Sequence, residues 1–301
     1  MTPDPAIRTE GLTKHYGDVE ALNDLDLEVA AGEVFGFLGP NGAGKTTMIR
    51  TILDLIRPTR GRAELLGLDS HHDAVEIRRH IGYLPSDLAM YPRLTGRDTL
   101  RYFANLRGGV DWSYVEELAT RLKADLSPKV GELSSGNRQK VGIIQAFMSR
   151  PRLLVMDEPS AGLDPLMQRE FQKLMREVAA DGRTVFLSSH TLSEVQAVAD
   201  RVGVIREGNL VEVSRVADLR SKAIRTVELE FTEPVEAAVF EGIDGASDVR
   251  VANHHVVLSY EGPMADLLRV AAGRYELVDI ASEEADLEEI FLTYYQDEVG
   301  A

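Results

Sequence analysis

The chain has 301 residues, of which 44% are hydrophobic, and it contains no cysteine. This length suffices for one large folded domain with room for a second, smaller one. The absence of cysteine excludes disulfides, thiolate nucleophiles and zinc–thiolate sites. A net charge of −16 argues against a general nucleic-acid-binding role, because affinity for phosphate backbones requires clustered lysine and arginine.

The beginning of the chain and its hydrophobic runs predict where the protein resides. Residues 1–5 lack the basic-then-apolar pattern of a signal peptide, and no apolar run approaches the roughly 18 to 20 residues that a bilayer span needs. We therefore expect the chain itself to be cytosolic.

Acidic residues are concentrated in the C-terminal quarter. Residues 221–301 contain 18 Asp or Glu and 5 Lys or Arg, whereas residues 1–220 contain 31 and 28. A composition change of this size predicts a domain boundary near residues 221–224. An acidic surface alone favours solubility rather than a binding site.

Residues 6–215 alternate short β-rich runs with helical patterns, which is typical of an α/β domain. Three continuously apolar runs predict core strands, namely 34–38, 152–156 and 184–188. The spacing of apolar residues from Met167 to Val178 predicts a helix with one buried face.

Two further segments of this region differ from the α/β rhythm. Apolar residues alternate with acids over 25–29, which predicts an antiparallel strand with one solvated face. Residues 85–133 contain two helical patterns, 95–106 and 113–122, and no convincing strand. We therefore expect an inserted helical lobe there.

The segment after residue 224 has the order β-α-β-β-α-β of a ferredoxin-like domain. The expected elements are strands at 226–231, 248–251, 255–259 and 275–280 and helices at 234–240 and 263–272. A final helix, 286–295, has one apolar stripe and should dock on a neighbouring surface. The expected domains are thus 1–220 and 225–301.

A glycine-rich loop lies between a predicted core strand and a predicted helix. It fits the pattern Gly, four residues, Gly-Lys-Thr, and its residues are Gly39, Pro40, Asn41, Gly42, Ala43, Gly44, Lys45 and Thr46. Such a loop turns backbone N–H groups around a β-phosphate, Lys45 neutralises the β and γ oxygens, and Thr46 offers a hydroxyl to Mg²⁺. We assign the next residue, Thr47, to the same site. The loop predicts binding of ATP and Mg²⁺.

The strand at 152–156 is followed by two acids, which should lie at the carboxyl edge of the sheet. Asp157 would hold Mg²⁺ through its water shell, and Glu158 could orient or deprotonate the water that attacks the γ-phosphate. The alternative is a strand that simply ends in charged residues. The phosphate loop favours the functional interpretation.

A small polar turn opens a helix between these two motifs, with the sequence Leu133-Ser134-Ser135-Gly136-Asn137-Arg138-Gln139-Lys140. It resembles the signature sequence of ABC ATPases, usually Leu-Ser-Gly-Gly-Gln, with Ser135 for the first glycine and Asn137 for the glutamine. Ser134 and the N–H of Gly136 would form an anion-binding helix start. An ordinary helix cap is the alternative.

The resemblance to ABC ATP-binding subunits covers residues 6 to about 220 and implies roles for three more residues. Tyr16 matches the aromatic residue that stacks on adenine, Asp164 lies in the loop that crosses the dimer, and His190 matches the histidine that reaches the γ-phosphate. The implied fold is a P-loop NTPase core with an antiparallel β subdomain and a helical lobe. The ending 287–295 resembles the drug, lipid or polymer exporter branch.

The resemblance implies an ATP-hydrolysing subunit that works as an ATP-dependent homodimer, in which residues 134–137 complete the partner's site. Separate membrane-spanning permease subunits would hold it at the cytoplasmic face of the membrane and use dimer closure for transport. No nucleic-acid partner is expected. The alternatives are a soluble ABC ATPase not coupled to transport and a nucleotide-regulated binding module that hydrolyses little.

One residue departs from the family pattern. After 81–85 the family places a glutamine that touches Mg²⁺ and the attacking water, and here Ser86 stands in its place. A serine hydroxyl is too short to span that gap without a water molecule. Either Asp87 substitutes, or the metal affinity and the coupling to the helical lobe are weaker.

Two pairs of adjacent histidines, 71–72 and 254–255, are predicted to be solvated rather than metal-binding. Adjacent residues on a strand point to opposite faces, and neither pair has a third ligand at the spacing of a metal site.

Overall fold

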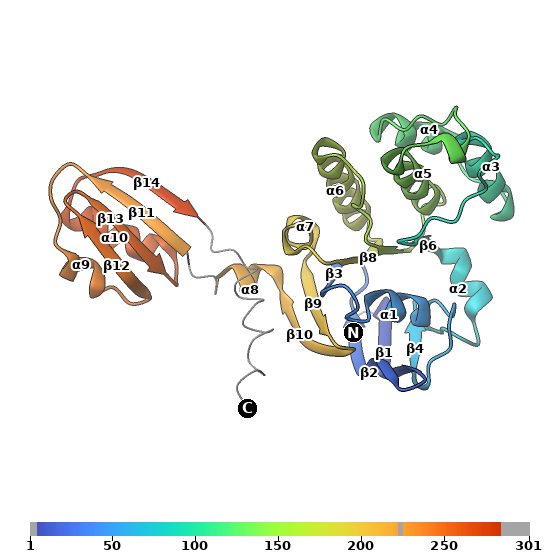
Figure 1. Cartoon of the computed structure of the whole chain (residues 1–301), viewed down its shortest axis with the longest axis horizontal. Coiled ribbons are helices and arrows are strands. Elements are labelled where there is room, and N and C mark those ends of the chain that lie inside the picture. Colours follow the sequence, from blue (N-terminus) through green and yellow to red (C-terminus); the bar gives the residue numbers. More distant parts are fainter. Residues whose placement is uncertain (1–4, 222–224, 284–301) are drawn as a thin grey trace. The chain divides into compact units, whose positions relative to one another are not determined.

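The structure, a computed structural model, describes residues 5–221 and 225–283. Its contacts divide the chain into two compact units, 1–213 and 214–301 (Figure 1). The boundary lies before helix α8 (Val216–Ser221), whereas the sequence placed it after this helix. The two positions differ because the charge composition marks where the acidic excess begins, and the contacts mark where the packing changes.

A six-stranded sheet forms the centre of the first unit, with the order β10-β9-β3-β8-β7-β6. Its strands are β3 (Val34–Leu38), β6 (Ile81–Leu84), β7 (Leu153–Asp157), β8 (Thr184–Ser189), β9 (Arg201–Arg206) and β10 (Asn209–Arg215). All pairs from β9 to β6 are parallel. The three predicted core strands are therefore present, as the neighbours β3, β8 and β7.

Both faces of this sheet are covered, so β3, β7 and β8 are buried at every position. Leu153 faces an apolar cluster that includes helix α1 (Lys45–Ile52), and the next residue, Leu154, faces a cluster on the opposite side. Helices α5 (Ser135–Phe147) and α6 (Pro165–Ala180) contribute to that second cluster and lie on that side of the sheet (Figure 1). Burial on two faces explains why these strands are mostly apolar, with buried polar residues only at the strand ends, namely Asp157, Thr184, Ser188 and Ser189.

A four-stranded antiparallel sheet packs on the α1 side, with the order β2-β1-β4-β5. Its strands are β1 (Ile7–Tyr16), β2 (Val19–Val29), β4 (Arg60–Leu65) and β5 (Leu68–Asp69). In β2, Leu25, Leu27 and Val29 are buried and the residues between them are exposed, as the alternation predicted. Two short helices complete this unit, α2 (Ala74–His80) and α7 (Leu192–Val198).

The predicted helical lobe is present. Residues 85–133, all of which the structure describes, contain α3 (Gly96–Leu106), α4 (Trp112–Arg121) and the 3₁₀ turn η1 (Val130–Glu132) but no strand. Thr95 begins α3, because its hydroxyl accepts a hydrogen bond from the N–H of Asp98. The lobe packs against α5, the helix that carries the signature turn.

The second unit contains a four-stranded antiparallel sheet with the order β12-β13-β11-β14. Its elements are β11 (Arg225–Phe231), α9 (Ala237–Glu241), β12 (Ala246–Ala252), β13 (His255–Tyr260), α10 (Met264–Arg274) and β14 (Leu277–Glu283). The order along the chain and across the sheet is that of the expected ferredoxin-like arrangement.

Two elements of this unit differ in extent from the prediction. Helix α9 begins at Ala237 rather than at Pro234, because Val235 donates its N–H to the carbonyl of Asn253 and keeps that segment outside the helix. Strand β14 begins after Tyr275, whose ring packs against Phe231 and whose N–H ends α10. The expected helix at 286–295 lies outside the described residues.

Candidate active site

The glycine-rich loop connects β3 to α1, and its glycines are required by conformation and by space. Gly42 and Gly44 have φ angles of 85° and 110°, which residues with a side chain rarely adopt. A Cβ atom on Gly44 would lie 2.6 Å from the carbonyl oxygen of Ala21, and one on Gly39 would lie 2.4 Å from that of Ile205. The loop therefore holds a tight shape that only this glycine pattern permits.

Lys45, the first residue of α1, is 6% exposed, and its ammonium is held by the loop itself. Its Nζ donates to the carbonyl oxygens of Gly39 at 2.6 Å and Pro40 at 3.2 Å. The same Nζ lies 3.3 Å from Oε1 of Glu158. A cation fixed in this way, beside a helix N-terminus, is suited to bind an anion.

Asp157 ends β7 and is fully buried, and both of its carboxylate oxygens accept hydrogen bonds from hydroxyls. Thr46 Oγ1 donates to Oδ2 at 2.7 Å, and Ser188 Oγ on β8 donates to Oδ1 at 2.6 Å. Burial raises the pKa of the nearby Tyr83, and the charge of Asp157 raises it further. Carboxylate and hydroxyl oxygens are ligands that Mg²⁺ prefers, so Thr46 and Asp157 fit a magnesium ion.

Glu158 follows Asp157 in a strained conformation, with a φ angle of 50°. Its N–H donates to Ser188 Oγ at 3.1 Å, and its Oε2 lies 2.8 Å from Nδ1 of His190, which follows β8. Its Oε1 is buried and accepts no hydrogen bond. The carboxylate thus has one oxygen fixed by His190 and one oxygen without a donor, next to Lys45.

These groups surround a pocket of about 300 Å³. Its lining residues are Ala21, Pro40, Asn41, Gly42, Gly44, Lys45, Thr46, Thr47, Ser86 and Glu158. Ser86 and Asp87 are both exposed, and of the two only Ser86 lines the pocket. Gly39 and Ala43 shape the loop without lining the pocket, and Asp157 lies behind Thr46.

Tyr16 lies at the end of β1, 49% exposed and outside the pocket lining. The Nζ of Lys14 lies 4.9 Å from the centre of its ring. Ala21, on the neighbouring strand β2, does line the pocket. An exposed ring near the pocket strand is available for stacking on a planar base.

The predicted signature turn does not line this pocket. Ser134 caps α5, and its Oγ accepts from the N–H of Asn137 at 3.2 Å. The Asn137 side chain exchanges two hydrogen bonds with the backbone of Asp125, at 2.6 and 2.9 Å. Asn137 therefore joins the helix start to the helical lobe, a structural role that the sequence did not indicate.

The signature turn packs instead against the loop that follows Glu158. A Cβ atom on Gly136 would lie 2.5 Å from the carbonyl oxygen of Gly162, and Ser135 lies beside the same glycine. Asp164, in this loop, caps α6 by accepting from two N–H groups of its first turn. A change in one of these segments must therefore displace the other.

Two residues of the site were not assigned from the sequence. Ser188 connects the two acids, since its hydroxyl contacts both Asp157 and the N–H of Glu158. Gln139 is buried and donates from Nε2 to the carbonyl of Pro159 at 2.7 Å, so it connects α5 to the segment after Glu158. The sequence offered one signal for each residue. Ser188 lies two residues before His190, and Gln139 belongs to the signature turn.

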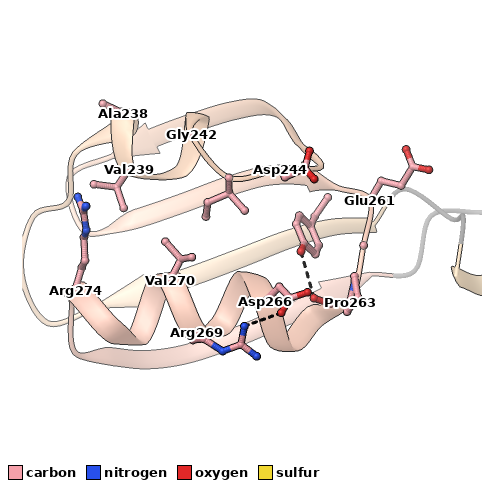
Figure 2. A pocket seen from close by; sticks show the side chains of 13 residues that line it. Ala238, Val239, Gly242, Asp244, Glu261, Pro263, Asp266, Arg269, Val270 and Arg274 are labelled. Atoms are coloured by element: carbon pink, nitrogen blue, oxygen red, sulfur yellow. Dashed lines mark hydrogen bonds and ion pairs between the residues drawn. The ribbon is translucent and has the colours of Figure 1, made fainter.

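A second, larger hollow of about 720 Å³ lies in the second unit, between α9 and α10 (Figure 2). Three of its lining residues are acidic, Asp244, Glu261 and Asp266, and the last is paired with Arg269 at 2.9 Å. It contains no glycine-rich loop and no lysine. The glycine-rich loop and the buried lysine belong to the smaller pocket of the first unit.

None of the helices in the described residues is long and apolar enough to cross a membrane.

Comparison with known proteins shows which family this chain is similar to. The sequence pattern of the family described as ABC transporter matches residues 22–161. The bacitracin transport ATP-binding protein BcrA of Enterococcus faecalis is 32% identical over 97% of this chain and 96% of its own length. The daunorubicin resistance ATP-binding protein DrrA3 of Streptomyces coeruleorubidus is 33% identical over 96% of this chain and 95% of its own.

Among solved structures, an ATP-binding subunit of an ABC transporter is similar at a TM-score of 0.65 and 30% identity. It covers 71% of this chain and 92% of its own length. The two sequence relatives match almost the whole chain, so their similarity includes the second unit as well as the phosphate-loop unit.

Proposed function

This chain belongs to the ATP-binding subunits of ABC transporters and hydrolyses ATP, and from that premise we propose that two copies close around two ATP molecules to drive an exporter. The observation that carries the proposal is the connected set Lys45, Thr46, Asp157 and Glu158 around the phosphate-loop pocket. Together they supply a cation for phosphate, ligands for a metal and a carboxylate oxygen that is ion-paired with Lys45 but accepts no hydrogen bond.

The residues divide the chemistry as follows. Backbone N–H groups of the loop and the start of α1 bind the β-phosphate, and Lys45 leaves its carbonyl partners to neutralise the β and γ oxygens. Thr46 and Asp157 would hold Mg²⁺, and the ion would supply positive charge beside the phosphates. Tyr16 stacks on the adenine.

Glu158 acts as the general base in this proposal. Its buried Oε1, which accepts no hydrogen bond, takes a proton from the attacking water, while His190 fixes Oε2 and reaches toward the γ-phosphate. The strained backbone at Glu158 is of the kind that accumulates at functional sites. Ser86 lines the same pocket, and its short side chain would reach the water shell of a metal only through an intervening water.

The need for a second copy is supported by the position of the signature turn. Residues 134–137 do not line the pocket of their own chain, yet they start a helix whose N-terminus can bind an anion. We infer that they complete the ATP site of the partner, with the loop around Asp164 crossing between the copies. ATP then favours the closed dimer, and its hydrolysis removes that preference.

Membrane-spanning partners follow from the same premise. The relatives are described as a bacitracin transport and a daunorubicin resistance ATP-binding protein, which favours export as the direction. We infer that separate permease subunits bind this chain at the cytoplasmic face of the membrane and convert dimer closure into alternating access.

Substitution of the proposed base tests this function. Glu158→Gln keeps the shape of the side chain but cannot accept a proton, so turnover should fall by about 10² to 10⁴ while ATP binding remains. ATP should then accumulate in a closed dimer, which gel filtration with ATP and Mg²⁺ would detect. The exposed Glu207→Gln is the matched control. Turnover at the unsubstituted rate, or a monomer in the presence of ATP, would refute the assignment.

A further inference from the structure

Two imidazoles and one carboxylate come together at the edge of the second unit's sheet. The Nε2 atoms of His254 and His255 lie 3.9 Å and 3.7 Å from Oε1 of Glu230. One ligand atom from each of the three side chains lies within 4.8 Å of the others. In residues 5–221 and 225–283, no other three histidine or acidic side chains approach one another in this way.

From the sequence, this histidine pair was predicted to be solvated, because adjacent strand residues point to opposite faces and no third ligand has the spacing of a metal site. The backbone meets neither condition. Strand β12 ends at Ala252 and β13 begins at His255, so Asn253 and His254 form the turn of a hairpin, and Asn253 has a φ angle of 59°. His254 is therefore not on a strand and does not alternate with His255. The two rings lie side by side, with centres 4.4 Å apart.

The third ligand comes from the neighbouring strand, which spacing along the chain does not reveal. Glu230 on β11 is directly opposite His255 on β13. The turn is also tied to β11 and to the segment after it, because Phe231 donates its N–H to the carbonyl of His254 and Val235 donates to that of Asn253. Backbone hydrogen bonds thus hold the three ligand positions before any ion binds.

We propose that His254, His255 and Glu230 form a binding site for a divalent transition-metal ion such as Zn²⁺. In a tetrahedral site with bonds of about 2.0 to 2.2 Å, neighbouring ligand atoms lie about 3.3 to 3.5 Å apart. The distances of 3.7 and 3.9 Å must therefore shorten by only a few tenths of an ångström. The ligand atoms of His254 and His255, which lie within 4.8 Å of each other, must approach as well, by rotation of the two side chains. The fourth position would be taken by water.

The surrounding charge favours a cation at this place. Asp279 on β14 is directly opposite Glu230, on the side away from His255. Glu228 lies two residues before Glu230, so its side chain is on the same exposed face of the sheet. The negative field of these carboxylates attracts a divalent ion and offsets part of the cost of bringing it to the protein.

Asn253 is positioned to orient one ligand. Its amide nitrogen lies 3.0 Å from Nδ1 of His254. A rotation of the amide by half a turn places its oxygen there, so that Nδ1 donates to Asn253 and Nε2 keeps a lone pair for the metal. Hydrogen bonds of this kind fix the tautomer of metal-binding histidines.

A zinc titration of the nucleotide-free, tag-free full chain, measured by calorimetry, tests the proposal. The unsubstituted chain should bind one more Zn²⁺ than the double variant His254→Ala/His255→Ala, and Glu230→Gln should bind that ion at least tenfold more weakly. The matched control is His71→Ala/His72→Ala, which removes an adjacent pair with rings 5.1 Å apart and no third ligand. Equal stoichiometry and affinity in the double variant and the unsubstituted chain would overturn the proposal.

A measurement on the unsubstituted chain tests the same site without any variant, so its result does not depend on whether a variant folds. Zn²⁺ should slow hydrogen exchange at the N–H groups of Phe231 and Val235, because both donate to carbonyls of the ligand-bearing turn. Protection confined to the phosphate-loop unit, or no protection, would place the ion elsewhere and refute the site.

Discussion

The two units differ in how deeply the ionisable residues of their candidate sites are buried and in how closely those residues are bound to their neighbours. In the first unit, Lys45 and Asp157 are buried, and each is fixed by hydrogen bonds of 2.6 to 3.2 Å. In the second unit, Glu230 and His254 are half-buried and His255 is exposed, and Oε1 of Glu230 lies 3.7 to 3.9 Å from Nε2 of the two histidines. The first site combines two runs of consecutive residues at the ends of parallel strands, and the second combines a hairpin turn with one residue of the neighbouring strand.

This difference sets the scale of the expected effects. Removing a buried charge leaves its partners without a counterpart, which costs far more than removing an exposed one. Substitutions in the phosphate-loop pocket should therefore change nucleotide binding and turnover strongly. Deletion of the acidic second unit should leave the ATP affinity almost unchanged.

The largest effect is expected at Lys45. Lys45→Ala removes the cation that neutralises the β and γ oxygens and also leaves Glu158 without its ion-pair partner. ATP affinity should fall about 100-fold, since charge-assisted hydrogen bonds contribute about 1.5 to 3 kcal/mol each. Equilibrium binding of a fluorescent ATP analogue measures this loss. Lys173→Ala, which removes an exposed lysine on α6, is the control, and equal affinity in both variants would refute the phosphate-loop assignment.

The next largest effect is expected at Gly136, in the signature turn, and it should change turnover but not ATP binding by the monomer. Gly136→Ala places a methyl group 2.5 Å from the carbonyl oxygen of Gly162, so one of the two backbone segments must move. Turnover of the dimer should fall about tenfold or more, because small displacements at a reacting centre are costly. ATP binding by the monomer should stay unchanged.

The matched control for this prediction is Gly273→Ala, a glycine in α10 with an ordinary φ angle and open space around it. Steady-state turnover and monomer binding would be measured for both variants. Loss of monomer binding in Gly136→Ala would indicate that the turn serves its own pocket rather than that of the partner.

A smaller effect is expected at Ser86, which lines the pocket but has a short side chain. Ser86→Gln restores a side chain long enough to reach the metal, so turnover should rise severalfold or the Mg²⁺ requirement should fall. A magnesium titration of the ATPase rate measures both. No change, or a loss, would mean that this pocket is built around serine. Because Asp87 is exposed and outside the lining, Asp87→Asn should leave the magnesium titration unchanged.

Sequence reasoning reached most of the fold because the first unit buries its strands on two faces. Strands β3, β7 and β8 have mostly apolar sequences because both of their faces are buried, so they were recognisable from the sequence. The order of helices and strands in the second unit was also predictable from the sequence, but the first residues of α9 and β14 were not. Those ends depend on contacts of Val235 and Tyr275 with residues far along the chain.

The same distinction applies to the candidate sites. The phosphate loop and the acid pair are consecutive residues, so their chemistry was predictable from the sequence. Ser188, Gln139 and the Asn137–Asp125 pair depend on tertiary contacts, which a single sequence does not reveal. The approach of Glu230 to the histidine pair at 254–255 was not predictable for the same reason, because Glu230 lies on the neighbouring strand.

The smallest effect is expected from removing the second unit. A chain ending at Ser221 keeps every residue that lines the phosphate-loop pocket, so its ATP affinity should stay within about twofold of the full chain. Equilibrium binding of ATP to both chains measures this. A truncated protein that folds but does not bind ATP would show that the two units are not independent.

Dimerisation of the same two chains distinguishes three roles for the second unit, namely pairing, regulation and solubility. Two paired copies of residues 221–301, each with 18 acidic and 5 basic residues, repel each other, and salt screens that repulsion. A pairing role therefore predicts that dimers of the full chain strengthen as ionic strength rises, and that the truncated chain dimerises less and without this trend. Sedimentation of the Glu158→Gln background at low and high salt measures both. Equal salt dependence in the two chains would assign the trend to the first unit and leave regulation or solubility as the role of the second.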